Sequence, residues 1–171
     1  MSYLSISPEL FIEVISTYLN THDLISIYYT GSIKLEDLYT CFINKILKKL
    51  QGIFRNNYIK VINFIKNNKV SIFGSFVLES ILGENYNGDI DFCCDSHLEK
   101  ECSDFCQSIG VRDLNKRDRY YENTNTMKLS VIESVMSCMY DIENTKSKKL
   151  DFVSLTVNHH QEFILSTDVN I

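Results

Sequence analysis

The sequence lacks alanine and tryptophan entirely and contains only one proline and six glycines. It is rich instead in Ile, Asn, Lys, Tyr and Phe, which are residues that A/T-rich codons encode. This bias indicates an A/T-rich genome, and it means that the missing alanine says little about helix propensity. No internal repeat or low-complexity segment stands out.

Long apolar runs are also missing. No segment approaches the roughly 18 consecutive apolar residues that a bilayer-spanning helix needs. The N-terminal sequence MSYLSISPELF lacks the basic start and apolar core of a signal peptide. We therefore expect an intracellular, cytoplasmic protein without a membrane segment. Its 171 residues leave room for one medium domain, or for a small domain with an appendage.

Metal-binding cysteine motifs are absent from the sequence. Six cysteines are present, but none forms a Cys-x-x-Cys pair or shows the Cys/His spacing of a zinc finger. We interpret them as free thiols in a reducing compartment. The net charge of -5 argues against a protein that coats nucleic acid, although it leaves room for a local basic face.

The first 37 residues show helical periodicity. Ser7 is a candidate N-cap, followed by Pro8 at the first helical position and Glu9 near the positive helix end. Thr21 is a candidate N-cap for a second helix, which we expect to end at Gly31. A third helical segment begins near residue 34.

The segment ISPELFIEVISTYLNTHDLISIYYTGS resembles an F-box over roughly the first 30 residues. The matching positions are Pro8, Glu9, Leu10, Ile15, Tyr18, Leu19, Asp23, Leu24 and Ile27. The family's tryptophan is missing, and its third helix is hard to place. The resemblance implies that residues 4–30 bind a Skp-type ubiquitin-ligase subunit, with Leu10, Ile15 and Leu24 facing outward. The alternative is a helical hairpin that packs on the downstream domain.

Residues 38–68 form a basic amphipathic helical connector. No Asp or Glu occurs between residues 38 and 78, whereas seven cationic residues do. These are Lys45, Lys48, Lys49, Arg55, Lys60, Lys66 and Lys69. We expect one or two helices with a break near Gln51 and Gly52. The basic face either attracts polyphosphate or an RNA end, or is simply a solvated helix surface.

From residue 69 onward the pattern changes to alternating strands and helices. The sequence predicts a strand over 69–73, a helix after Gly74, a strand at 89–94 and a helix over 97–109. The polar stretch 112–126 shows no clear periodicity. Strands are predicted over 127–140 and 150–157, with residues 143–149 as a hairpin loop. The whole pattern favours an α+β fold, with an N-terminal helical segment followed by a mixed sheet flanked by helices.

Asp89 and Asp91 carry the clearest chemical signal. Residues two apart in a strand point to the same face, so the two carboxylates project together. They repel each other unless a cation lies between them, and Mg²⁺ prefers carboxylate and phosphate oxygens. At the preceding turn, Gly74 lets the backbone approach a ligand, and Ser75 offers a hydroxyl beside the helix N-terminus. These residues predict a site for a metal and a phosphate.

Asp151 is the candidate third carboxylate. It lies between Leu150 and Phe152, so a strand that buries these neighbours turns Asp151 to the opposite face. A two-metal displacement needs such a third acid, because one oxygen is activated while another leaves.

Together these motifs resemble the nucleotidyltransferase superfamily of the DNA polymerase beta type. The matching segments are Phe73-Gly74-Ser75, Asp89-Ile90-Asp91-Phe92 and Leu150-Asp151-Phe152, within about 100 C-terminal residues. The resemblance implies a minimal nucleotidyltransferase-type domain over 69–171. In it Asp89, Asp91 and Asp151 are the catalytic and metal-binding acids, and Gly74 and Ser75 bind phosphate. The resemblance also implies two Mg²⁺ ions, an NTP substrate and transfer of an NMP to a hydroxyl of an RNA, a protein or a small molecule.

The sequence departs from the superfamily pattern at its C-terminal end. About 20 residues follow Asp151, so the helical domain that many relatives use for base and acceptor binding is missing. The alternative function is an F-box-type ubiquitin-ligase adaptor with an idle nucleotidyltransferase-like domain. His159 and His160 are interpreted as loop residues. We predict three parts: an F-box-like helical segment over 1–37, the basic connector over 38–68 and a nucleotidyltransferase-like domain over 69–171. F-box-like and nucleotidyltransferase-like segments on one chain from an A/T-rich genome suggest a eukaryote or a large DNA virus that infects one.

Overall fold

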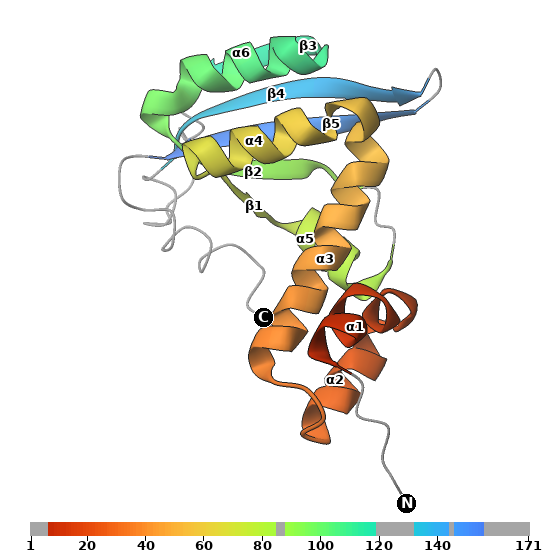
Figure 1. The fold of residues 1–171 in the computed structure, drawn as a ribbon. Helices are drawn as coiled ribbons and strands as arrows, with labels where there is room; N and C mark the ends of the chain where they lie inside the picture. The colour runs from red at the N-terminus through yellow and green to blue at the C-terminus, as the bar shows by residue number, and fades with distance from the viewer. Residues whose placement is uncertain (1–6, 85–87, 119–131, 144–145, 156–171) are drawn as a thin grey trace, which may run out of the picture.

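The computed structural model describes residues 7–84, 88–118, 132–143 and 146–155. The predicted α+β class is confirmed, with a mixed sheet flanked by helices and an N-terminal helical segment at one end of the long helix α3 (Figure 1). The elements follow in the order α1 (Pro8–Glu13), η1 (Ile15–Tyr18), α2 (Thr21–Tyr29), α3 (Leu35–Phe54), η2 (Arg55–Asn57), α4 (Tyr58–Asn68), β1 (Ser71–Phe73), α5 (Ser75–Leu82), β2 (Ile90–Asp95), η3 (Ser96–Leu98), α6 (Glu99–Ile109), β3 (Arg112–Asp118), β4 (Ile132–Glu143) and β5 (Lys146–Leu155), where η marks a 3₁₀ turn.

The sheet has five strands in the order β1-β2-β5-β4-β3. β2 and β5 run parallel, whereas the other neighbouring strands are antiparallel. The chain between the two parallel strands includes α6, β3 and β4, which supplies the long crossover that parallel pairing requires. The pairing brings residues 90–95 of β2 beside residues 150–155 of β5.

Helices cover one face of the sheet, and aromatic rings fill the space between them. Alternate residues of β5, among them Leu150 and Phe152, point into this core. Phe152 stacks on Phe92 of β2 with the ring centroids 4.8 Å apart, and Phe64 of α4 stacks on Phe105 of α6 at 4.1 Å. Burial of these rings therefore fixes which residues of β2 and β5 face the opposite side of the sheet.

The N-terminal helices begin with side-chain caps. Ser7 caps α1 by accepting a hydrogen bond from the Leu10 amide at 3.2 Å, as predicted. The predicted N-cap of α2 is wrong: Asn20, not Thr21, accepts from the Asp23 amide at 2.9 Å and completes a capping box. Thr21 instead donates its hydroxyl to the Ile81 carbonyl of α5 and so ties α2 to the rest of the fold.

The expected break near Gln51 and Gly52 is also wrong, because α3 continues through both residues to Phe54. Leu50 and Phe54 are fully buried, and their packing holds the helix together across the glycine. The chain turns at Arg55, which has a positive φ of 44°. α3 also runs without interruption across the predicted boundary between residues 37 and 38.

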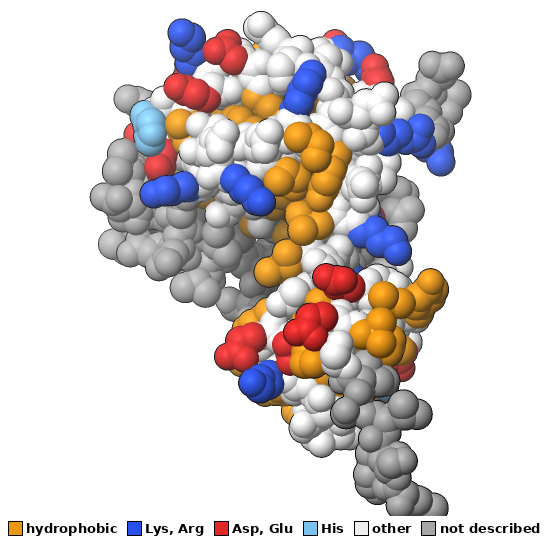
Figure 2. Space-filling model, in the orientation of Figure 1, with side chains coloured by type: hydrophobic (Ala, Val, Ile, Leu, Met, Phe, Trp, Pro, Cys, Tyr) orange, Lys and Arg blue, Asp and Glu red, His pale blue; other side chains and the backbone are white. Residues whose placement is uncertain are grey.

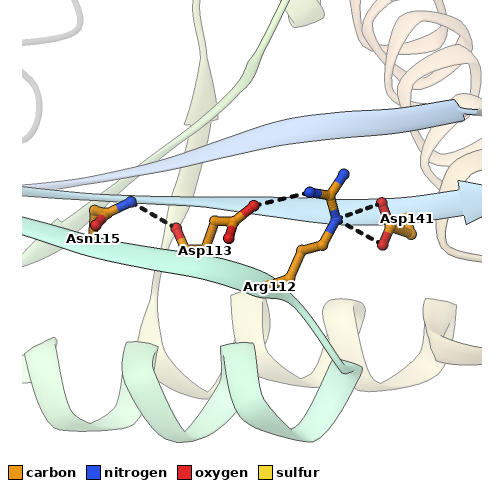
Figure 3. A network of polar contacts seen from close by, with 4 residues as sticks. All are labelled: Arg112, Asp113, Asn115 and Asp141. Carbon is orange, nitrogen blue, oxygen red and sulfur yellow. Dashed lines mark hydrogen bonds and ion pairs between the residues drawn. The ribbon is translucent and has the colours of Figure 1, made fainter.

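The polar stretch after residue 112 forms the edge strand β3, which the sequence did not predict as a strand. β3 pairs with β4 with an irregularity between Arg112 and Asn115, and Asp113 has a φ of 55°. Arg112 Nε contacts both carboxylate oxygens of Asp141 at 2.9 and 3.0 Å, and its Nη1 contacts Asp113 at 2.9 Å (Figure 3). An edge strand of this kind is solvated, so it carries no alternating apolar pattern.

The hairpin between β4 and β5 is tighter than expected. Glu143 pairs with Lys146, so residues 146–149 belong to β5 and their assignment to a loop is wrong. β4 begins at Ile132 and β5 ends at Leu155. The remainder of the two predicted strands, together with His159 and His160, lies outside the described residues.

Two further expectations concern the cysteines and membrane-spanning helices. All six cysteines are free thiols with buried side chains. Within the described residues, none of the helices combines the length and apolar character that a membrane crossing requires.

An ion pair between α3 and α5 gives a first testable prediction. Glu79 is fully buried, and Lys49 donates to its Oε1 at 2.5 Å. Replacing Lys49 alone with methionine leaves a buried, uncompensated carboxylate and should lower the free energy of unfolding by roughly 3 kcal/mol, the lower end for a buried pair because Lys49 is partly exposed. Replacing both residues with methionine should recover most of that loss, because an apolar pair needs no counter-ion.

Urea unfolding of the two variants and of Lys48→Met measures this effect. Lys48 is exposed on the same helix, so its replacement removes the same charge without touching Glu79. Equal unfolding free energies for Lys49→Met and Lys48→Met would show that the pair does not hold α3 to α5.

Candidate functional site

The structure brings the three predicted acids together at neighbouring strands. Asp91 of β2 and Asp151 of β5 are direct partners in the parallel register. Asp89 immediately precedes β2, two residues before Asp91. All three belong to the side of the strands opposite the aromatic core, because Phe92 and Phe152 occupy the alternate positions. Long-range pairing therefore joins two motifs that lie about 60 residues apart in the sequence.

The Gly74-Ser75 turn lies directly against these acids. Phe73 of β1 pairs with Asp91, so the turn that follows β1 begins beside the carboxylates. Gly74 has a φ of 76° and forms the N-cap of α5. A Cβ atom at Gly74 would lie 2.7 Å from Asp91 Oδ2, which leaves no room for a side chain. The glycine is thus required both by its backbone conformation and by the neighbouring acid.

Gly88 is a second glycine of the site, and the sequence interpretation missed it. A Cβ atom there would overlap Ser75 Oγ. The loop before β2 therefore passes directly over the hydroxyl that was predicted to bind phosphate. A glycine one residue before the Asp-x-Asp motif was the available signal, but it becomes meaningful only once the loop is placed beside α5.

Lys149 is the main site residue that the sequence interpretation missed. Its Nζ donates to Asp89 Oδ2 at 2.9 Å and to Asp151 Oδ2 at 2.6 Å. Lys149 lies two residues before Asp151 in β5 and therefore points to the same side of the strand. The assignment of residues 143–149 to a loop concealed this spacing. The positive charge beside the acids thus comes from β5, the strand that also carries Asp151.

Burial and repulsion perturb the acid at the centre of the group. The pKa of Asp91 is raised from 3.8 to about 6, first by burial and then by the negative charges of Asp151 and Asp89, while the positive charge of Lys149 lowers it. The pKa of Lys149 is itself raised, first of all by its hydrogen bond to Asp151. One ammonium group therefore only partly compensates three neighbouring carboxyl groups.

Asp151 is the most enclosed member of the Lys149 ion pairs. Its side chain is 14% exposed, compared with 40% for Asp89 and 41% for Lys149. Asp151 Oδ1 is buried and has no hydrogen-bond partner among the described residues. Such an oxygen is normally satisfied by a donor or a cation, so it marks a position where a ligand would gain a partner.

The donor chemistry fits Mg²⁺, which favours carboxylate oxygens, and the unpartnered Asp151 Oδ1 offers one. The present arrangement is not a formed metal centre. Within the described ranges, no group of three or more His, Cys, Asp or Glu side chains is disposed to hold a metal ion. Between Asp89 and Asp151 lies the Lys149 ammonium, in the place that a cation would take.

Polar residues continue from the acids across the sheet. Ser137 of β4 is the register partner of Asp151, and Asn115 of β3 is the partner of Ser137. Direct partners on neighbouring strands project to the same face, with Cβ atoms about 4.5–5.5 Å apart in an antiparallel pair. The row Asp91, Asp151, Ser137 and Asn115 therefore forms a polar strip that begins at the acids and ends at the exposed Asn115.

A cavity of about 430 Å³ lies elsewhere, against α6 and strands β3 to β5. Its lining includes Met136, Ser134 and Ser154, which alternate with the residues of the polar strip and so face the other side of the sheet. Glu99 accepts from Ser134 at 2.6 Å and from Lys116 at 2.7 Å, so these polar groups already bind one another. The cavity is therefore separate from the acids.

Comparison with known proteins adds no assignment. No protein-family model matches the chain, and searches of curated proteins and of solved structures return no match either. The resemblances to a nucleotidyltransferase and to an F-box thus stay predictions that rest on the residues themselves.

The raised pKa of Asp91 predicts how stability depends on pH. Its folded-state pKa of about 6 lies above its ordinary value of 3.8, so the ionised carboxyl destabilises the folded metal-free protein at pH 7. This penalty disappears as the pH falls from 7 through 6 towards 4, where the folded state holds the proton. Asp91→Asn should therefore raise the free energy of unfolding at pH 7 by about 1–2 kcal/mol, allowing for screening by solvent.

Urea unfolding in the presence of EDTA at pH 7 and pH 5 tests this prediction. The gain in the variant should shrink at pH 5, because wild-type Asp91 is then mostly protonated. Asp104→Asn, an exposed change on α6, should show no such pH-dependent difference. A difference between Asp91→Asn and wild type that is equal at both pH values would contradict the interpretation.

Proposed function

We propose that this protein is a Mg²⁺-dependent nucleotidyltransferase that moves an NMP from an NTP to a hydroxyl acceptor. The observation that carries the proposal is the meeting of Asp89, Asp91 and Asp151 beside the Gly74-Ser75 turn. A turn that can hold phosphate oxygens and a group of acids that can hold divalent cations are adjacent, as the chemistry of a metal-bound triphosphate requires.

The phosphate side of the site consists of Gly74, Ser75 and the first turn of α5. The eight-residue helix α5 begins at this turn, where the first backbone N–H groups of a helix point outward, and Ser75 adds a hydroxyl. Gly74 allows a close approach because it carries no side chain. These groups would hold the triphosphate while its terminal pyrophosphate leaves.

The acid side would hold the cations and the acceptor. Asp89 and Asp91 would bind the metal and through it the triphosphate, and Asp151 would complete the set. Two Mg²⁺ ions, when bound, supply charge neutralisation and make the acceptor hydroxyl more acidic. The acceptor oxygen forms a bond to the α-phosphorus, the bond to pyrophosphate breaks, and Asp151 takes part in removing the hydroxyl proton.

The polar strip offers a place for the acceptor. Ser137 and Asn115 continue from Asp151 towards the β3 edge of the sheet. Their hydroxyl and amide groups can hydrogen-bond sugar hydroxyls or a peptide side chain. An RNA, a protein or a small molecule fits this description, and the strip contains no aromatic residue on which a base would stack.

Transfer of radioactive label from each of the four NTPs to total RNA and protein tests the proposal. Incorporation should require Mg²⁺ and should fall by at least about 100-fold in the double variant Asp89→Ala, Asp91→Ala, because both carboxylates act on the transferred phosphate. Glu101→Ala with Asp104→Ala is the matched control, since it removes two exposed acids from α6. Absence of any Mg-NTP binding by calorimetry in the wild type would refute the function.

A second candidate is supported by the surface of the N-terminal helices. Leu10 is 50% exposed, Val14 46% and Tyr18 85%, and hydrophobic side chains gather on part of this region (Figure 2). We propose, as the alternative, that residues 4–30 bind a Skp-type adaptor and that the sheet domain is idle. One detail of the F-box expectation is wrong: Leu24 is fully buried in the core of the helical segment, because it packs against α3 residues such as Leu38 and Cys41.

Binding to a purified Skp-type subunit tests this alternative. Leu10→Asp with Val14→Asp should abolish retention in a pull-down, since an apolar docking face cannot bury two carboxylates. Ile59→Asp is the control, because Ile59 is a comparably exposed apolar residue on α4. No retention of the wild type would exclude the adaptor.

A further inference from the structure

Lys149 is the cation that the described site already contains. Its Nζ lies 2.9 Å from Asp89 Oδ2 and 2.6 Å from Asp151 Oδ2, so a single ammonium bridges acids from two strands. We propose that Lys149 is an internal competitor for the divalent metal: metal binding displaces its ammonium from Asp89 and Asp151, and the released ammonium then binds the phosphates of the nucleotide. This inference rests on the proposed function, because it concerns the same site.

Displacement follows from the size of the site. A bound Mg²⁺ would take carboxylate oxygens at about 2.0–2.1 Å. The oxygens that face the space between Asp89 and Asp151 are the ones that now accept from Lys149. A divalent ion and an ammonium held by the same two oxygens would be close neighbours of like charge, which costs free energy at this distance. One cation must leave before the other can bind fully.

Lys149 is the partner that can move. Its side chain is 41% exposed and carries its charge on a flexible four-carbon chain. Asp151, by contrast, is 14% exposed and belongs to a strand with neighbours on both sides. The acids therefore stay in place while the ammonium swings outward. Asp151 Oδ1, which has no partner among the described residues, remains available to the incoming ion.

The released ammonium has an evident new partner. The Gly74-Ser75 turn lies beside Asp91, so triphosphate oxygens held there would be close to the metal and to the end of the Lys149 chain. Metal alone must break two ion pairs, whereas metal together with nucleotide replaces them with ammonium–phosphate contacts. Metal and nucleotide should therefore strengthen each other's binding, as a shared coupling free energy requires.

Lys149→Met separates the two roles. The variant should bind Mn²⁺ about tenfold more tightly than wild type, because the competing charge is gone. It should bind a Mg²⁺ complex of non-hydrolysable ATP about tenfold more weakly, because a phosphate contact is lost. Electron paramagnetic resonance of free Mn²⁺ gives the first value and calorimetry the second, so neither readout depends on activity.

Lys148→Met is the matched control. Lys148 is the preceding residue of β5, carries the same charge and points to the opposite face of the strand. It should alter neither affinity by more than about twofold, because its charge lies near the acids without contacting them. Lys149→Gln serves as a second variant that keeps a polar side chain of similar length, and it should show the same two opposite shifts.

The outcomes separate this inference from the proposed function. If wild type and Lys149→Met bind Mn²⁺ equally, Lys149 is no competitor, and if the variant binds both ligands more tightly, the released ammonium does not bind phosphate. Either result overturns the inference, while the metal site and the proposed function stand. If neither wild type nor either Lys149 variant binds Mn²⁺, the proposed function fails together with the inference. A tenfold gain for Mn²⁺ with a loss for the nucleotide supports both.

Discussion

Three carboxylates that meet at one point of a sheet repel one another unless a positive group lies beside them. In the described structure Lys149 is that group, and the strand pairing around it holds the acids together. The pairing of β2 with β5 sets Asp91 beside Asp151, and the rings of Phe92 and Phe152 hold both strands in this register. Asp91 and Asp151 cannot separate without disrupting the core, because each is followed by a buried ring in its strand. Lys149, two residues before Asp151, is the compensation that β5 itself supplies.

The helical part of the chain supports the site through α5, the helix that begins at the Gly74-Ser75 turn. Lys49 of α3 binds the buried Glu79 of α5, and Thr21 of α2 binds the α5 carbonyl of Ile81. Lys45 of α3 donates to the Leu19 carbonyl at 2.9 Å, and Lys60 of α4 to the Ser108 carbonyl at 2.8 Å. Several of the cations that the sequence placed on a basic face thus join elements of the fold, which favours a structural role for that part of the connector.

Local chemistry was visible in the sequence, whereas long-range pairing was not. The Ser7 cap, the helix ending at Ile109 and the Asp89–Asp91 spacing depend on residues a few positions apart, and each could be predicted. The partnership of Asp91 with Asp151 could be proposed only from the need for a third acid and from resemblance, since nothing local links the two residues. Lys149 was missed because polar residues next to a hairpin look like a loop, although β4 pairing extends the strand through them. The edge strand β3 was missed because many of its side chains face solvent rather than a core, so no alternating apolar pattern marks it in the sequence.

The electrostatics of the site leave the three acids only partly compensated. A lysine that fully neutralised the acids would leave a stable, inert cluster, and apolar residues would serve stability better still. Burial first, and then the charges of Asp151 and Asp89, raise the pKa of Asp91 to about 6 in spite of Lys149, so the ionised carboxyl costs the folded protein free energy at neutral pH. Asp151 Oδ1 is likewise buried without a partner among the described residues. Proteins keep destabilising arrangements of this kind mainly where function uses them. Under the proposed function, the arrival of a divalent cation with its phosphate ligand would relieve both the excess negative charge and the unpartnered oxygen, and the partly exposed Lys149 would move to make room.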